Sequence, residues 1–165
     1  MATSSIKKTS PIATNKPADA IALLRADHKA VAALFAEYTT LRSPAKKKAL
    51  VTKICTELSV HAQVEEEIFY PAVQKALKDH ALIPEAVVEQ STMKDLIAQV
   101  EGKEPDGDLF DAKITVLAEY VTHHVKEEHS EMFPKAKATS LDMLVLGAHM
   151  AARKGELLAA RGAPQ

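Results

Sequence analysis

Apolar residues recur every three or four positions along most of this chain, which is the period of one face of an α-helix. One such stripe runs from Ile21 to Tyr38, and a second runs from Leu50 to Ile68. A third runs from Ile83 to Val100, and a fourth from Phe110 to Met132. No segment alternates apolar and polar residues for long enough to compete as a strand. The pattern therefore predicts four long amphipathic helices.

Capping and helix-breaking residues separate the four stripes. Ser43 is a typical N-cap, and Pro44 follows it at the first helical position. Pro71 should end or kink the second helix, and Pro134 should close the fourth. Ser140 is a candidate cap for a further helix. Because the links are short, we expect an all-α fold, an antiparallel up-down-up-down four-helix bundle with a short C-terminal fifth helix.

Residues 1–16 lack this period and are rich in Ser, Thr, Lys and Pro. We expect them to form a disordered tail before a single domain that spans residues 17–160. The tail lacks the apolar stretch of a secretory signal. No apolar run approaches the roughly 18–20 residues that a membrane span needs. We therefore expect a cytoplasmic protein with no membrane partner.

The charge balance and the cysteine count exclude several classes of function. Twenty-one Lys and Arg against 22 Asp and Glu give a formal charge of -1. This excludes the strongly basic profile of a nucleic-acid binder, so no nucleic-acid partner is expected. The single cysteine, Cys55, can form neither an intrachain disulfide nor a cysteine-based zinc site. The seven histidines are the unusual count, and their places on the stripes indicate the chemistry.

The second and fourth stripes carry the same short motif. A His precedes a Glu by four residues, and an aromatic residue and a Pro follow at identical offsets. The two copies are His61, Glu65, Tyr70 and Pro71 in the second helix and His124, Glu128, Phe133 and Pro134 in the fourth. Positions four apart lie on one helix face, so each imidazole and carboxylate can point at one ion or at two neighbouring ions.

His28 adds a third imidazole on the apolar stripe of the first helix. Inward His and Glu side chains from several helices are how bundle proteins build carboxylate-bridged dimetal sites. Without a metal, such groups would be costly to bury. Mixed nitrogen and oxygen ligation suits iron, manganese or zinc, and two carboxylates able to bridge favour two iron ions. The Glu-x-x-His pattern of ferritin-like sites and the His-Glu-x-x-His pattern of metalloproteases are both missing.

Together these motifs resemble the hemerythrin family in its bacterial HHE cation-binding branch. The resemblance covers about Asp19 to Lys137 and rests on Asp27-His28 and on the two His-x-x-x-Glu motifs. It implies a four-helix bundle that holds a non-haem diiron centre, with Glu65 and Glu128 as bridges between the ions. The metal ligands that it implies are His28, His61, Glu65, His124 and Glu128.

The third helix departs from the family, which usually has a His there just after a Glu. Here the matching pair is Glu89-Gln90. Gln90 is a sixth candidate metal residue, but its neutral amide oxygen is a weaker ligand for iron than imidazole. We expect one of the two metal positions to be weakened. A labile second ion, a single metal ion and a largely structural site all stay open.

Helical-wheel positions place Glu89, His123 and His129 away from the inner face. His80 and His149 fall near predicted helix ends or on the last helix, so we expect them at the surface or outside the metal ligands. Tyr70 and Phe133 are expected to pack beside the metal as apolar neighbours that exclude water.

The sequence thus predicts a non-haem iron protein that binds or senses dioxygen or a related small redox ligand such as nitric oxide. One alternative is a diiron enzyme that decomposes peroxide. The other is a metal-storage or structural site weakened at Gln90. We assign no catalytic side chain apart from the metal ligands, and the sequence leaves the oligomeric state open.

Overall fold

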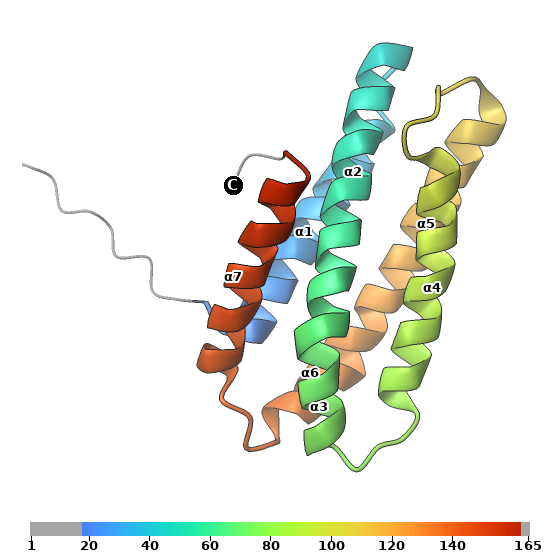
Figure 1. The fold of residues 1–165 in the computed structure, drawn as a ribbon. Helices are drawn as coiled ribbons and strands as arrows, with labels where there is room; N and C mark the ends of the chain where they lie inside the picture. The colour runs from blue at the N-terminus through green and yellow to red at the C-terminus, as the bar shows by residue number, and fades with distance from the viewer. Residues whose placement is uncertain (1–17, 163–165) are drawn as a thin grey trace, which may run out of the picture.

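The computed structural model describes residues 18–162, and this part of the chain folds into helices (Figure 1). Four long helices run alternately in opposite directions, as the apolar stripes predicted. They are α1 (Ala20–Tyr38), α2 (Pro44–Val64), α4 (Leu82–Val100) and α5 (Asp108–Glu127). The all-α up-down-up-down bundle is therefore confirmed. The predicted tail, residues 1–16, lies outside the described residues.

Three of the helices begin with a side chain that caps their free N–H groups. Asp19 caps α1, and Ser43 caps α2 as predicted. The last helix, α7 (Met143–Ala160), is capped by Asp142, which accepts hydrogen bonds from two backbone N–H groups. The prediction that Ser140 caps this helix is wrong, because the helix begins three residues later and Asp142 is the adjacent acceptor.

The fifth helix, α7, packs along α1 and α2 (Figure 1). It has 18 residues, against 19 in α1, and is longer than the short helix that we expected. Gly147 allows the backbones of α7 and α1 to approach closely. A Cβ atom added at Gly147 would lie 2.5 Å from the carbonyl oxygen of Ala18 and 2.7 Å from the backbone nitrogen of Ala20. The fifth helix is therefore an integral part of the fold.

Neither Pro of the repeated motif ends its helix. A π-helical turn precedes each Pro, and a short α-helix then continues. These segments are η1 (Glu65–Phe69) and α3 (Tyr70–Ala76) after α2, and η2 (Glu128–Met132) and α6 (Phe133–Lys137) after α5. A Pro ring clashes with a carbonyl of the preceding turn in a regular α-helix, and the wider π turn accommodates it. The prediction that Pro134 closes the helix is therefore wrong by three residues.

The apolar core is divided into two clusters by a layer of polar side chains. One cluster includes Leu24, Val64, Ala86 and Met132, and the other includes Val31, Leu58, Met93 and Leu117. On each of the four long helices, the polar layer falls between the two clusters. Its members are the six candidate metal residues His28, His61, Glu65, Gln90, His124 and Glu128. The polar layer thus has an apolar cluster on either side of it along the length of the bundle.

Polar residues are spread along every long helix of the bundle. Among residues 18–162, no helix is both long enough and apolar enough to cross a lipid bilayer.

Candidate metal centre

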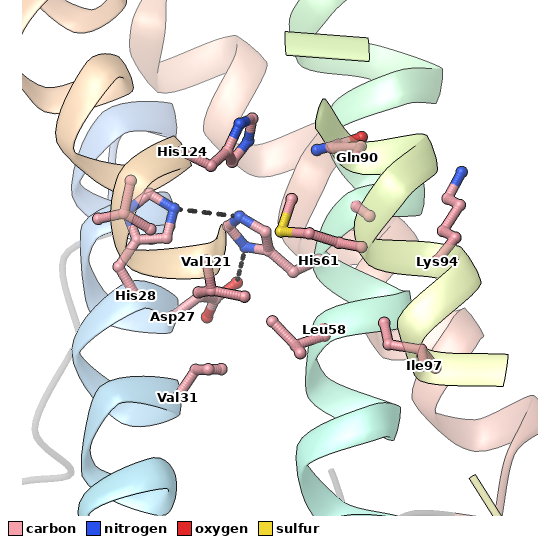
Figure 2. Close-up of a pocket in the computed structure, with 13 residues that line it drawn as sticks. Asp27, His28, Val31, Leu58, His61, Gln90, Lys94, Ile97, Val121 and His124 are labelled. Carbon is pink, nitrogen blue, oxygen red and sulfur yellow. Dashed lines mark hydrogen bonds and ion pairs between the residues drawn. The ribbon is translucent and has the colours of Figure 1, made fainter. Parts of the chain in front are cut away.

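The fold brings all six predicted residues together inside the bundle. Each of these residues is at most 9% exposed, and Glu65 is completely buried. They come from α1, α2, η1, α4, α5 and η2, so every long helix contributes one side chain or more. Figure 2 shows the three imidazoles and the amide of Gln90 facing one another across the space between the helices.

Two imidazoles and two carboxylates form the first half of the centre. Nε2 of His28 lies 3.1 Å from Nε2 of His61 and 3.2 Å from Oε2 of Glu128. Nε2 of His61 lies 3.3 Å from Oε1 of Glu65. Ligand atoms about 2.0–2.2 Å from one ion lie about 3 Å apart, so these four atoms have the spacing of a single coordination sphere. All four lie within 4.8 Å of one another.

The second half of the centre surrounds the hydroxyl of Tyr70. This oxygen lies 3.1 Å from Oε2 of Glu65, 2.9 Å from Oε1 of Glu128 and 3.2 Å from Nε2 of His124. The amide nitrogen of Gln90 lies 2.9 Å from the same hydroxyl. Each carboxylate therefore directs one oxygen to each half, as a bridging ligand does. Tyr70 is buried as predicted, but its polar end lies within the centre.

The outer nitrogen of each imidazole also has a partner. Nδ1 of His61 lies 3.2 Å from a carboxylate oxygen of Asp27, and Nδ1 of His124 lies 2.6 Å from Glu89. Nδ1 of His28 lies 2.9 Å from Nε2 of His129. An N–H donated outward to a carboxylate leaves the lone pair of Nε2 directed inward, which is the tautomer that a metal requires.

Asp27 also connects the centre to the fifth helix. Its second carboxylate oxygen accepts a hydrogen bond from the ammonium group of Lys154 at 2.5 Å. Burial alone would raise the pKa of Asp27, but the hydrogen bonds and charges of His61 and Lys154 outweigh it and lower the pKa. Asp27 therefore stays ionised and holds the imidazole of His61 in place. Lys154 on α7 fixes Asp27 in turn.

The buried carboxylates of the metal-free centre are balanced by protonated imidazoles. Burial alone would lower the pKa of His61, but Glu65 and Asp27 raise it to about 10. Burial likewise opposes protonation of His124, yet Glu128 and Glu65 raise its pKa to about 9. Burial and the charge of Glu128 raise the pKa of Glu65 to about 6. Positive charge from two protonated imidazoles thus stabilises two carboxylates that are out of contact with water.

Within the described part of the chain, residues 18–162, three buried oxygen atoms of the centre have no hydrogen-bond partner, namely Oε1 of Glu65, Oε1 of Gln90 and Oε2 of Glu128. Unpaired acceptors are rare in protein interiors because they lose water without compensation. Two of them belong to the carboxylates of the first half. A metal ion is the partner that nitrogen and oxygen donors in this arrangement would accept, so the residues fit one.

The other polar candidates were predicted to lie off the inner face. His80, His123 and His149 are exposed. His129 and Glu89 direct no atom into the centre, but each contacts an inner imidazole from outside, which helical periodicity did not predict. For Asp27 the sequence offered one sign of a role at the site, which is its position directly before His28. Its contact with His61 depends on how α1 and α2 pack.

Comparison with known proteins identifies the family. Residues 19–136 match the family model described as the Hemerythrin HHE cation binding domain. The chain belongs to this family. A curated relative, named a DNA nickase in Nostoc sp., is 33% identical over 111 residues. The matched stretch covers 67% of this chain but 31% of that protein, so the chain spans about a third of the relative's length.

A solved structure supports the same fold. It is a hemerythrin HHE cation-binding domain-containing protein from Mycobacterium kansasii, with a TM-score of 0.75. The match covers 87% of this chain and 89% of that one, at 22% sequence identity. The resemblance to the hemerythrin family is thus confirmed at the level of family and fold.

Proposed function

We propose that this hemerythrin-like protein holds iron in the buried His/Glu centre and binds a small redox ligand, such as dioxygen or nitric oxide, beside it. One observation carries the proposal. Three imidazoles direct Nε2 inward onto two carboxylates, and each carboxylate presents one oxygen to each half of the centre. Iron, when bound, would supply the affinity for diatomic ligands and the redox chemistry.

A small cavity next to the centre supports binding of a small ligand. It has a volume of about 30 Å³, which is enough for a molecule about the size of water (Figure 2). The polar groups of His28, His61, Gln90 and His124 line one side. The rest of the lining is mainly apolar, from Val31, Leu58, Met93, Ile97, Val121 and Val125. An apolar cavity of this size favours an uncharged diatomic molecule over a large organic substrate.

The protein side chains have distinct roles in this proposal. His28, His61, Glu65 and Glu128 would hold the ion of the first half. His124 and the same two carboxylates would hold the second ion. The hydroxyl of Tyr70 is a further ligand atom available there. Gln90 directs its amide nitrogen to this half, so its oxygen would bind the ion only after the amide turns over. Asp27 and Glu89 would hold two of the imidazoles in the tautomer that binds metal.

The two halves should differ in affinity, because the first has two imidazoles and the second has one. Gln90 occupies the place where an imidazole is usual in the family. We expect Gln90→His to bind the second ion more tightly than the wild-type protein does. Iron titration followed by metal analysis compares the two proteins. Equal stoichiometry and equal affinity would show that the asymmetry does not exist.

Decomposition of peroxide is the second candidate function. The observation that favours it is the O–H group of Tyr70, which lies within hydrogen-bond distance of both bridging carboxylates. A proton held there could be delivered to a reacting oxygen atom. The nickase activity named for the Nostoc relative is not carried over, because the match covers only 31% of that protein.

Metal analysis and optical spectroscopy test the proposal. The protein is purified without chelators, reconstituted anaerobically with ferrous iron and then exposed to dioxygen or nitric oxide. We expect bound iron and charge-transfer bands that depend on the added gas. His61→Ala should lose them, and His149→Ala, which changes an exposed histidine on α7, should retain them. A wild-type protein that binds no iron would contradict the proposal. Peroxide consumption, measured with and without metal, tests the second candidate.

A further inference from the structure

A second cluster of potential metal ligands lies at the surface between α4 and α5. Nε2 of His123 lies 3.3 Å from Oε1 of Glu89 and 3.2 Å from Oε1 of Glu127. One ligand atom from each of the three residues lies within 4.8 Å of the others. The side chain of His123 is 61% exposed and that of Glu127 is 42% exposed, so an ion in solution can reach them.

The chemistry of this outer cluster suits a divalent transition-metal ion. His123 and Glu127 are four residues apart on one face of α5, and Glu89 approaches from α4. One imidazole nitrogen and two carboxylate oxygens are a ligand set that zinc, manganese and ferrous iron accept. Among residues 18–162, neither carboxylate forms an ion pair with Lys or Arg.

A small cavity joins the outer cluster to the inner centre. Its lining includes Glu89 and Glu127 from the outer cluster and His124 and Glu128 from the inner centre. The cavity has a volume of about 10 Å³. A shallow groove lined by Pro84, Glu85 and Val88 continues from the two outer carboxylates toward solvent. Carboxylates thus follow one another from the surface to the buried ligand Glu128.

Glu89 belongs to both clusters at once. Its Oε1 faces His123, and its Oε2 lies 2.6 Å from Nδ1 of the inner residue His124. At the inner end, Glu128 is 1% exposed and directs its Oε1 to the second half of the centre, beside His124. An ion held by the outer cluster would therefore be separated from the second half by the side chain of His124.

We propose that Glu89, His123 and Glu127 bind a divalent transition-metal ion at the surface. This outer site then supplies metal to the inner centre through the small cavity between α4 and α5. The entry role rests on the proposed function of the inner centre. The binding role does not, because it concerns a separate set of ligands.

Zinc titration of the metal-free protein, followed by calorimetry and native mass spectrometry, tests the outer site. The wild-type protein should bind one more zinc ion than His123→Ala does. The matched control His149→Ala should bind as many as the wild type. His61→Ala should lose inner metal and retain the outer ion, which separates failure of the inner centre from failure of the outer site. Equal zinc stoichiometry in wild type and His123→Ala would overturn the proposal.

Stopped-flow loading with ferrous iron tests the entry role. In His123→Ala and Glu127→Gln, we expect iron to fill the inner centre at least about threefold more slowly, because carboxylates at a cleft concentrate cations. The final iron content should be the same as in the wild type. Glu37→Gln, which changes an exposed carboxylate on α1, is the control for charge alone. Unchanged loading rates in both His123→Ala and Glu127→Gln would overturn the entry role.

Discussion

The hydroxyl of Tyr70 lies 2.9 Å from Oε1 of Glu128, although the two residues are 58 positions apart in the chain. The π turn η1 contributes to this contact. In a regular α-helix, a residue five positions after Glu65 would point well away from it. In η1 the backbone N–H of Tyr70 donates to the carbonyl of Glu65, so the two residues lie nearly above one another. π turns of this kind are frequent at functional sites, and this one places a hydroxyl between two buried carboxylates.

Removal of that hydroxyl should weaken the second half of the centre. In Tyr70→Phe the two carboxylates and the amide of Gln90 lose their common partner. We expect the variant to retain one iron ion and bind the second more weakly. The metal-free protein should lose about 1–3 kcal/mol of unfolding free energy, because buried polar groups are left unpaired. Iron titration and urea unfolding measure both effects. Tyr120→Phe, at an exposed tyrosine, is the control, and matching behaviour of the two variants would contradict the assignment.

The carboxylate of Asp27 should contribute to metal affinity without touching the metal. Asp27→Asn keeps the shape of the side chain but weakens its hold on Nδ1 of His61 and on Lys154. Loss of such outer partners of metal ligands typically lowers metal affinity about 10–100-fold. Competition with a chelator of known affinity measures the change. Asp95→Asn, at an exposed site on α4, should bind metal as the wild type does. An unaltered affinity in Asp27→Asn would exclude this role.

The stability of the metal-free protein should fall as the pH rises above neutrality. The pKa of His61 is raised from 6.5 to about 10 and that of His124 to about 9 in the folded state. A raised imidazole pKa stabilises the fold fully below pH 6.5, and this stabilisation is lost as the pH rises through 9 to 10. The melting temperature should therefore decrease over that range.

Bound metal should reverse this dependence at moderate pH, because protons compete with the ion for the imidazoles. Thermal unfolding of metal-free and metal-loaded protein at pH 6.5 and pH 9.5 measures how the melting temperature of each form changes with pH. His61→Ala should flatten the slope of the metal-free protein. A slope that is equally steep in this variant would show that other groups control the dependence.

The close packing of α7 on α1 gives a test of the fold itself. Gly147→Ala places a methyl group 2.5 Å from the carbonyl oxygen of Ala18, so the helices must separate. We expect a loss of about 1–3 kcal/mol in unfolding free energy, as for other overpacked sites. Among residues 18–162, a Cβ atom added at Gly155 on the same helix meets nothing within 4 Å. Gly155→Ala should therefore gain up to about 1 kcal/mol from helix propensity. Urea unfolding of both variants should therefore give changes of opposite sign.

The sequence by itself predicted the bundle and the inward-facing ligands, because the apolar period determines which face of each helix is buried. His28, His61 and His124 lie in phase with that period, so the inward direction of each side chain follows from helical periodicity alone. Gln90 lies in the same phase, and the resemblance to the family indicated that it replaces the usual His. The phase of each side chain is a property of a single helix, so local spacing along the chain is enough to determine it.

The tertiary structure decided everything that depends on two helices meeting. Each of three features joins residues from different helices. They are the partner of each inner imidazole at Nδ1, the outer cluster between α4 and α5, and the hydrogen bond from Lys154 to Asp27. The place of the Tyr70 hydroxyl depends on the π turn η1, which has no reliable sequence signal. This turn changes the helical phase of the residues after it. Helical periodicity assumes a constant number of residues per turn, and it fails where the backbone departs from that number.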